Sequence, residues 1–294
     1  MNIGDWLMRF PSSLVIVSGR GVDTAVARLS REYSSTFDAI SRGLLSFINW
    51  VQAVVDIVPW WVLIAGVFLL GWRLKRKASQ GAVYALLLLL VGVLGLWELM
   101  YMTLGLVISS VIISLLIGLP VGVLIASYEK AEGFMKPLLD AMQTMPTFVY
   151  LIPAVMFFGM GKVPALIATT IYAAPPVIRL TSHAIRQVDK DVVEAAKAFG
   201  STKWQLLFKV QVPQALPTIM TGINQTMMMA MSMVVTCAMI GAKGLGMEVI
   251  IGINRLEIGR GLKAGIAIVI VAVLMDRLTQ GWFKKDARAG EGVE

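Results

Sequence analysis

The sequence predicts an all-α membrane protein, a polytopic bundle of about seven transmembrane helices with an amphipathic helix before them. Of its 294 residues, 57% are hydrophobic and 15% are charged, whereas soluble domains carry about 25% charged residues. Several apolar runs approach the roughly 20 residues that cross a bilayer. The basic residues cluster beside these runs, which indicates membrane topology rather than a nucleic-acid-binding surface.

Residues 1–56 form the N-terminal segment, which we expect to be external or interfacial. From Phe37 onward, apolar residues recur at helical spacing. This pattern predicts an amphipathic helix lying in the membrane interface; an ordinary helix packed on the bundle is the alternative. Pro11 interrupts the first apolar stretch, so the start does not fit a cleaved signal peptide.

Seven apolar stretches follow as candidate spans. The first is bounded by Trp60, Trp61 and Trp72, which suit the depth of the membrane interface. The fourth is short enough to be a buried or re-entrant segment instead. We expect residues 57–103 to hold the first two spans, 104–282 to form the core and 283–294 to be a cytoplasmic tail. The stretches are 58–72, 82–101, 104–127, 147–160, 164–182, 216–240 and 261–278.

The orientation follows from three basic segments, because Lys and Arg in short loops mark the cytoplasmic side. They lie at 73–77, at 186–209 and at 284–288. Seven spans place all three in the cytoplasm, with the N-terminus outside and the C-terminus inside.

The polar loop at about 183–215 predicts a helix, a sharp bend and a second helix. Val192, Ala196 and Phe199 form one apolar stripe at helical spacing. Gly200 permits the left-handed conformation that ends a helix. Thr202 and Gln205 have the spacing of a capping box that starts the second helix. We expect a later proline, at position 213, to break the run.

This loop resembles the EAA loop of the permeases of ABC importers. Glu, Ala, Ala, Gly and Pro stand at that motif's spacing, and Val210 and Val212 replace its Ile and Leu. The resemblance implies the type I ABC importer permease (MetI-like) fold and a separate ATPase that stands on the loop. ATP and Mg would then be bound by that partner, with no cofactor and no catalytic residue in this chain. The expected coupling residues are Glu194, Ala195, Ala196, Lys197, Phe199, Gly200 and Pro213.

Further segments across roughly 80–280 look like the glycine betaine/proline betaine subfamily. They are 140–146 running into 150–153, then 231–235, 244–246, 255–257 and 276–280. The resemblance implies import of a quaternary-ammonium solute such as glycine betaine, proline betaine or choline for osmoprotection. It also implies a homodimer of the permease in membrane lipid and an external substrate-binding protein.

The sixth apolar stretch is the best candidate for the wall of a pathway, because polar groups in a bilayer face protein or water and methionines adapt to changing partners. Prolines in the fourth and fifth stretches interrupt helical hydrogen bonding. Simple core filling and packing kinks are the alternatives. The candidates are Asn224, Met227, Met231, Ser232, Pro153 and Pro175.

The remaining features of the sequence say less about function. His183 and the single Cys237 have no partner of their kind, so no metal site is expected. The segment 241–246 is expected to be a tight external turn, near charges that either meet the binding protein or are solvated: Lys243, Glu248, Arg255, Glu257 and Arg260. The aromatic residues near the spans are scattered rather than forming a cage for a quaternary ammonium: Trp97, Tyr101, Tyr150, Phe157 and Phe158.

An ion-coupled secondary transporter of a small polar solute is the alternative function. Such carriers place ionisable residues near the middle of the membrane, whereas here Glu98, Asp276 and Arg277 stand near the ends of the apolar stretches. A channel has no use for a coupling loop. An enzyme would need clustered His, Cys or carboxylate residues in the spans.

Overall fold

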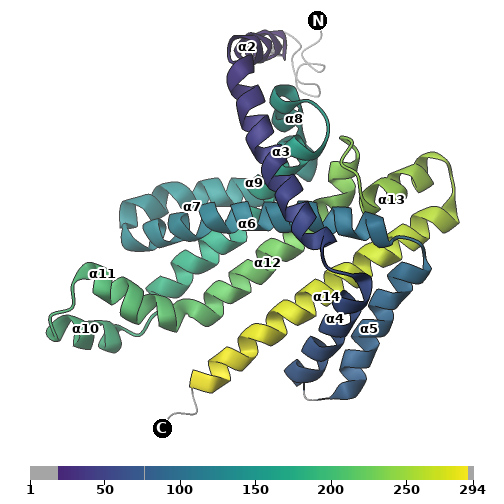
Figure 1. Cartoon of the computed structure of the whole chain (residues 1–294). Helices are drawn as coiled ribbons and strands as arrows, with labels where there is room; N and C mark the ends of the chain where they lie inside the picture. Colours follow the sequence, from purple (N-terminus) through teal and green to yellow (C-terminus); the bar gives the residue numbers. More distant parts are fainter. Residues whose placement is uncertain (1–18, 76, 291–294) are drawn as a thin grey trace, which may run out of the picture.

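The computed structural model describes residues 19–75 and 77–290, and the regular structure in these ranges is helical (Figure 1). The all-α prediction is confirmed. Pro11 and the last residues of the tail lie outside the described residues. The helices are α2 Gly19–Glu32, α3 Ser34–Asp56, α4 Trp60–Lys75, α5 Ala78–Val93, α6 Trp97–Ser127, α7 Glu129–Thr144, α8 Thr147–Phe158, α9 Lys162–Arg186, α10 Lys190–Ala198, α11 Lys203–Gln205, η2 Leu206–Gln211, α12 Val212–Ala238, α13 Leu245–Asn254 and α14 Ile258–Gly290.

The centre of the molecule is the packing of α6 and α12 on α9. A Cβ on Gly118 of α6 would lie 2.5 Å from Val177 Cγ1, and a Cβ on Gly222 of α12 would lie 3.2 Å from Val177 Cα. Small residues at helix crossings let backbones approach closely, which drives association in a bilayer. The Ser114 hydroxyl also donates to the Thr170 carbonyl at 3.1 Å, so a buried polar contact joins α6 to α9.

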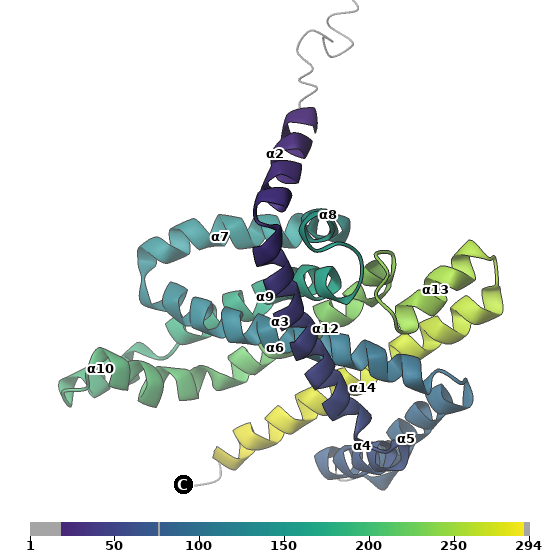
Figure 2. The ribbon, with the colours of Figure 1, turned by 45° about the horizontal axis from the view of Figure 1, so that its top comes forward.

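The other helices surround this centre. The α4–α5 hairpin and α13 pack against α14, and α7 returns alongside α6 (Figures 1 and 2). The short helices α10 and α11 protrude at one end of the bundle, and α8 and α13 lie toward the other end (Figure 1). A segment that follows α9 in sequence therefore projects well away from the packed centre.

Three helices among the described residues are long and apolar enough to cross a membrane: Trp97–Ser127, Lys162–Arg186 and Ile258–Gln280. Two bent pairs raise the number to as many as five if each pair is one span. They are Ser34–Asp56 with Trp60–Leu74, bent by 80°, and Lys130–Thr144 with Thr147–Phe158, bent by 97°. The count of seven spans stays a prediction.

Two predicted spans need correction. The span at 82–101 is wrong in its boundaries, because α5 ends at Val93, Gly95 turns with a φ of 75° and α6 begins at Trp97. The turn is hidden in the sequence because apolar residues run through it. The span at 147–160 is the twelve-residue α8, only about 18 Å long at 1.5 Å per residue. It follows the 97° bend after α7, so α7 and α8 together, rather than α8 alone, form the candidate for the fourth span.

The amphipathic helix α3 packs across the bundle on α6, α8 and α9. Ile48 and Val51 are buried, and the Phe37 ring lies 4.9 Å from the ring of Phe157, between ring centres. The predicted apolar face thus contacts other helices, which favours the packed alternative; a location in the membrane interface stays a prediction.

The region after α12 contains a helix in addition to the predicted turn. Gly241 and Gly244 have positive φ, as a tight turn requires. The turn leads into α13, a ten-residue helix that was not predicted. The α13–α14 hairpin closes where a Cβ on Gly252 would lie 2.6 Å from the Gly261 nitrogen.

Candidate functional site

The protruding loop begins with α10, and hydrogen bonds from neighbouring residues cap both ends of this helix. The Asp189 carboxylate accepts a hydrogen bond from the Asp191 amide at 2.9 Å and caps the N-terminus. At the other end, Gly200 N–H donates to the Lys197 carbonyl and Ser201 N–H donates to the Ala196 carbonyl. This is a Schellman motif with a left-handed glycine, φ 79°. The bend predicted at Gly200 is confirmed.

The second helix begins with the predicted capping box. The Gln205 amide donates to Thr202 Oγ1 at 3.3 Å, and the Thr202 amide donates to Gln205 Oε1 at 2.9 Å. Both reciprocal bonds of the box are therefore present.

The predicted break at Pro213 is wrong. The chain passes from α11 through the π-helical segment η2 directly into α12, with Pro213 in the first turn of α12. A proline has no N–H to give the usual i−4 carbonyl, and its ring clashes with that group. In η2 the Val212 amide reaches back to the Leu207 carbonyl, the wider spacing of a π-turn, so the helix continues.

One side of α10 rests on an apolar cluster at the base of α9 and α12. Val193 packs there against buried Val188, Leu207 and Ala215. The predicted stripe is thus displaced by one residue, because Val192 and Phe199 are exposed and Ala196 is only half-buried.

Other side chains of the loop are apolar and exposed. Phe199 is 91% exposed, and the parallel rings of Trp204 and Phe208 stack with their centres 5.7 Å apart. We call Val192, Phe199, Trp204 and Phe208 the apolar face of the loop. The loop also carries exposed lysines at positions 190, 197, 203 and 209, and Glu194 and Ala195 are exposed on α10. Exposed apolar side chains grouped in this way mark an interaction surface.

The expected pathway residues do not come together. Met231, at 3% exposed, and Pro175 are buried, and Met227 packs against the core cluster beside α14. Ser232 is exposed on α12, and Pro153 is exposed on α8. The polar groups and methionines of this helix that the sequence indicates include Gln225 and Met228 but not Thr221.

Thr221, Gln225 and Met228 are exposed together with Ser232 on α12. Their spacing of four, three and four residues places them on one side of the helix. We call them the polar face of α12. The spacing is readable in the sequence, but its exposure is not, because it depends on which side packs on α9 and α14.

Asn224 points elsewhere, into a polar cluster between α12 and α14. Its Nδ2 donates to Asp276 Oδ1 at 2.8 Å, and Gln280 Nε2 donates to the same oxygen at 2.6 Å. Asp276 is therefore paired with the middle of α12 rather than standing alone at the end of an apolar stretch.

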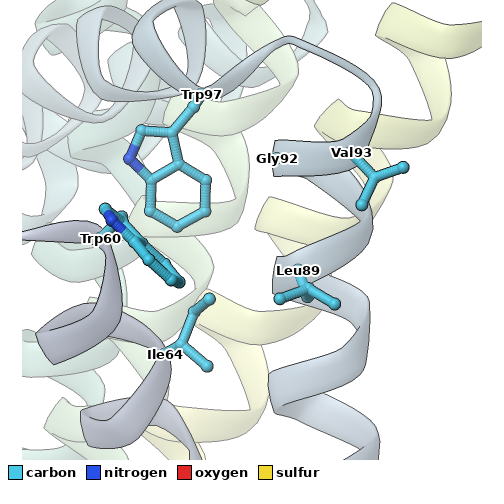
Figure 3. A pocket seen from close by; sticks show the side chains of 6 residues that line it. All are labelled: Trp60, Ile64, Leu89, Gly92, Val93 and Trp97. Atoms are coloured by element: carbon cyan, nitrogen blue, oxygen red, sulfur yellow. The ribbon is translucent and has the colours of Figure 1, made fainter.

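Trp60 and Trp97 line a pocket that the sequence did not predict. A cavity of about 350 Å³ opens between α4, α5 and the start of α6 (Figure 3). The ring of Trp97 also lies 5.6 Å from that of Tyr101, between ring centres. Side chains of the described residues that line it carry no charge, so it suits an apolar group. The lining is Trp60, Ile64, Leu89, Gly92, Val93 and Trp97.

The charged residues after α12 brace the α13–α14 hairpin. Arg260 donates to both carboxylate oxygens of Glu248, at 2.5 Å and 3.1 Å, and this hydrogen bond lowers the pKa of the Glu248 carboxyl. Leu256 and Ile258 are exposed at the hairpin tip. In the part of the chain that the structure describes, no three or more His, Cys, Asp or Glu side chains gather as metal ligands.

Comparison with known proteins supplies the wider setting. Residues 118–284 match the family described as "Binding-protein-dependent transport system inner membrane component". The glycine betaine transport system permease protein OpuAB of Bacillus subtilis is 45% identical over 260 residues, 88% of this chain and 92% of that protein. The glycine betaine/carnitine transport permease protein GbuB of Listeria monocytogenes is 47% identical over 257 residues, 86% of this chain and 91% of that protein.

The glycine betaine/proline betaine transport system permease protein ProW of Escherichia coli is 42% identical over 260 residues, 88% of this chain and 72% of that protein. Among solved structures, an inward-facing form of the MetNI methionine ABC transporter matches with a TM-score of 0.57 and 24% identity, covering 66% of this chain and 95% of that chain. This likeness concerns the fold alone.

Proposed function

This chain belongs to the family of binding-protein-dependent transport system inner membrane components, and we propose that it is the permease subunit of an ATP-driven importer of a quaternary-ammonium solute. The family match over 118–284 supports the transport role. The names of three relatives at 42–47% identity include glycine betaine. Glycine betaine, or a close relative such as proline betaine or choline, is therefore the proposed cargo.

The observation that carries the coupling proposal is the apolar face of the protruding loop. Phe199 is almost fully exposed at a bend that is fixed by hydrogen bonds on both sides. Such a rigid protrusion fits a cleft of a separate ATPase subunit, which would bind ATP and Mg. The exposed lysines of the loop suit acidic groups on that partner. This chain then hydrolyses nothing; it converts the displacement of α10 into movement of the bundle.

The polar face of α12 is the proposed wall of the solute pathway. Thr221, Gln225 and Ser232 are exposed on α12, a helix that overlaps the predicted sixth span at 216–240. In a bilayer, such groups are tolerated where protein or water satisfies them. A second copy of the chain facing this side would enclose a hydrated passage and complete the proposed homodimer.

The sidedness follows from the same arrangement. With the loop in the cytoplasm, the α13–α14 hairpin lies outside, where a substrate-binding protein would deliver the solute. The N-terminus is then outside and the C-terminus inside the cell. An ion-coupled carrier is the weaker alternative, because it has no use for the protruding loop.

Reconstitution tests this function. We expect the chain, combined with its ATPase and binding protein in lipid vesicles, to import labelled glycine betaine only when ATP is hydrolysed. The substitution Phe199→Glu places a charge in the docked apolar face and should abolish copurification of the ATPase. Phe134→Glu, on an exposed phenylalanine of α7, is the matched control. Uptake driven by an ion gradient without ATP would overturn the proposal.

A further inference from the structure

Arg186 joins three helices at the base of the coupling loop. It is the last residue of α9, and α10 begins only four residues later, at Lys190. Its Nη1 forms an ion pair with the Glu132 carboxylate of α7. Its Nη2 donates to the Ile125 carbonyl of α6 at 2.7 Å and reaches the Tyr128 carbonyl at 3.5 Å.

The Ile125 carbonyl lies in the last turn of α6, whereas the Tyr128 carbonyl also accepts hydrogen bonds from the Ala131 and Glu132 amides at the start of α7. The last carbonyls of an α-helix have no intrahelical donor, and a cation there also interacts favourably with the helix dipole. Tyr128 is the single extended residue between α6 and α7. Arg186 therefore contacts the junction of α6 and α7 on both sides, at the end of α6 and on α7.

A second ion pair extends this contact along the same two helices. Arg179 of α9 pairs with Asp140 of α7, and the Arg179 guanidinium donates to that carboxylate. The acidic residues are eight apart on α7 and the arginines seven apart on α9, so each pair of like residues shares a helix face. Between the two ion pairs lies a cavity of about 380 Å³, which Lys136 and His183 also line.

The loop itself contacts the bundle through a different set of residues. Val193 of α10 meets the apolar cluster of Val188 and Leu207, which connects it to α9 and α12. Displacement of α10 would reach α12 through this cluster. The same cluster also includes Leu119, Val123 and Ala126 of α6. Reaching the α6–α7 junction and α7 itself needs a further connection at the end of α9, and Arg186 lies there.

We propose that Arg186 is a positioning residue that transmits the movement of the coupling loop to the α6–α7 junction. The inference rests on the proposed function, because it assumes an ATPase docked on α10. The planar guanidinium suits the task, since it binds a carboxylate and helix-end carbonyls at the same time in fixed directions. A lysine ammonium is a single point charge on a flexible stem and cannot hold both. Movement of α9's end then carries α7, and through the 97° bend α8 as well.

The test is the number of solute molecules imported per ATP hydrolysed by the complete importer in vesicles. We expect Arg186→Gln to assemble with the ATPase and to hydrolyse ATP at near the wild-type rate, but to lower this ratio by about tenfold, within the range of ordinary coupling between sites. Arg186→Lys should fall between the two. Lys136→Gln removes a charge from the same cavity, where the described residues offer Lys136 no ion-pair partner, and should match the wild type.

Glu132→Gln provides a second route if Arg186→Gln does not fold. It removes the ion pair but leaves the carbonyl bonds, so it should lower the ratio to a smaller extent. An unchanged ratio in both Arg186→Gln and Glu132→Gln would overturn the proposal. So would a loss of ATP hydrolysis that parallels the loss of import, because that result means Arg186 only maintains the fold. A wild-type complex that binds no ATPase would instead refute the proposed function itself.

Discussion

The left-handed backbone of Gly200 sets the direction in which the protruding loop continues after α10. A Cβ at this position would meet no atom within 4 Å, so the glycine is required for its φ of 79° and not for space. An L-residue with a side chain loses roughly 1–2 kcal/mol in this conformation. The strain would be relieved by opening the Schellman bonds at Ser201, which would move Phe199 relative to Trp204.

We therefore expect Gly200→Ala to reduce ATP-dependent import several-fold, with Gly200→Asn less affected because asparagine tolerates the left-handed region. Gly133→Ala on α7 is the control, because that glycine has open space around it and no positive φ. There the change should be neutral or stabilising, by about 0.5–1 kcal/mol. Equal losses of import in Gly200→Ala and Gly133→Ala would contradict the assignment.

Glu248 makes the α13–α14 hairpin sensitive to acid. Its pKa lies below the ordinary carboxyl value of 4.5 because Arg260 donates to its carboxylate. A lowered pKa means that the ion pair stabilises the hairpin fully above the ordinary value and that this stability is lost as the pH falls through the folded pKa. The protection of 245–262 from hydrogen exchange, measured relative to the intrinsic exchange rate at each pH, should decrease in that acidic range. Glu248→Gln should abolish this pH dependence and weaken protection already at neutral pH.

Single residues whose role depends on the next few residues were predictable from the sequence. Gly200 and the Thr202–Gln205 box fall in this class, because caps are local hydrogen-bonding patterns. Met231 and Pro175 do not, since their burial depends on how α12 and α9 pack with other helices. The sequence does not distinguish Arg186 from the other basic residues of the loop, because the carbonyls that it contacts, at Ile125 and Tyr128, are about 60 residues away in the chain.

At the scale of helices, the α4–α5 hairpin is closed by two glycines in contact. A Cβ on Gly81 would lie 2.5 Å from the Phe68 carbonyl oxygen, and a Cβ on Gly71 would lie 2.7 Å from the Tyr84 ring. The hairpin is narrow at this end, and the Trp60–Trp97 pocket opens toward the other end (Figure 3). The glycines thus determine how far α4 and α5 diverge.

Gly81→Ala should destabilise the hairpin by about 1–3 kcal/mol, because overpacking displaces a backbone carbonyl rather than a flexible side chain. Gly66→Ala on α4 is the matched control, since its Cβ would meet no atom within 4 Å. Thermal melts followed by tryptophan fluorescence measure both, because α4 carries Trp60, Trp61 and Trp72. A melting temperature that is lower for Gly66→Ala than for Gly81→Ala would refute this account of the hairpin.

The errors at this scale have physical causes. Apolarity alone cannot reveal the turn at Gly95, because a run of Val, Leu and Trp is equally apolar in a span and in a turn between spans. Pro213 predicted a break because the sequence does not reveal the π-turn that accommodates the proline. The short α13 was missed because its apolar residues stand close to Gly244 and Gly246, which favoured a turn.

Across the whole molecule, we expect water to reach the polar face of α12 but not the apolar outer side of α14. Gln225 and Val269 are both exposed in a single copy of the chain. If the first lines a hydrated pathway and the second faces lipid, Gln225→Cys should react quickly with a charged thiol reagent and Val269→Cys slowly. Native Cys237 is 1% exposed and contributes little background. Equal rates at the two positions would exclude the proposed pathway.

The sidedness of the chain can be tested at its two ends. Phe199 on the coupling loop and Leu256 at the hairpin tip are 91% and 86% exposed, so cysteines there should react wherever water reaches them. The basic loops predict that the first lies inside the cell and the second outside. An impermeant maleimide should therefore label Leu256→Cys in intact cells and Phe199→Cys only after permeabilisation, in a Cys237→Ser background. The reverse pattern would put the apolar face of the loop out of reach of any ATP-hydrolysing partner, and the pathway, the coupling loop and the role of Arg186 would all have to be abandoned together.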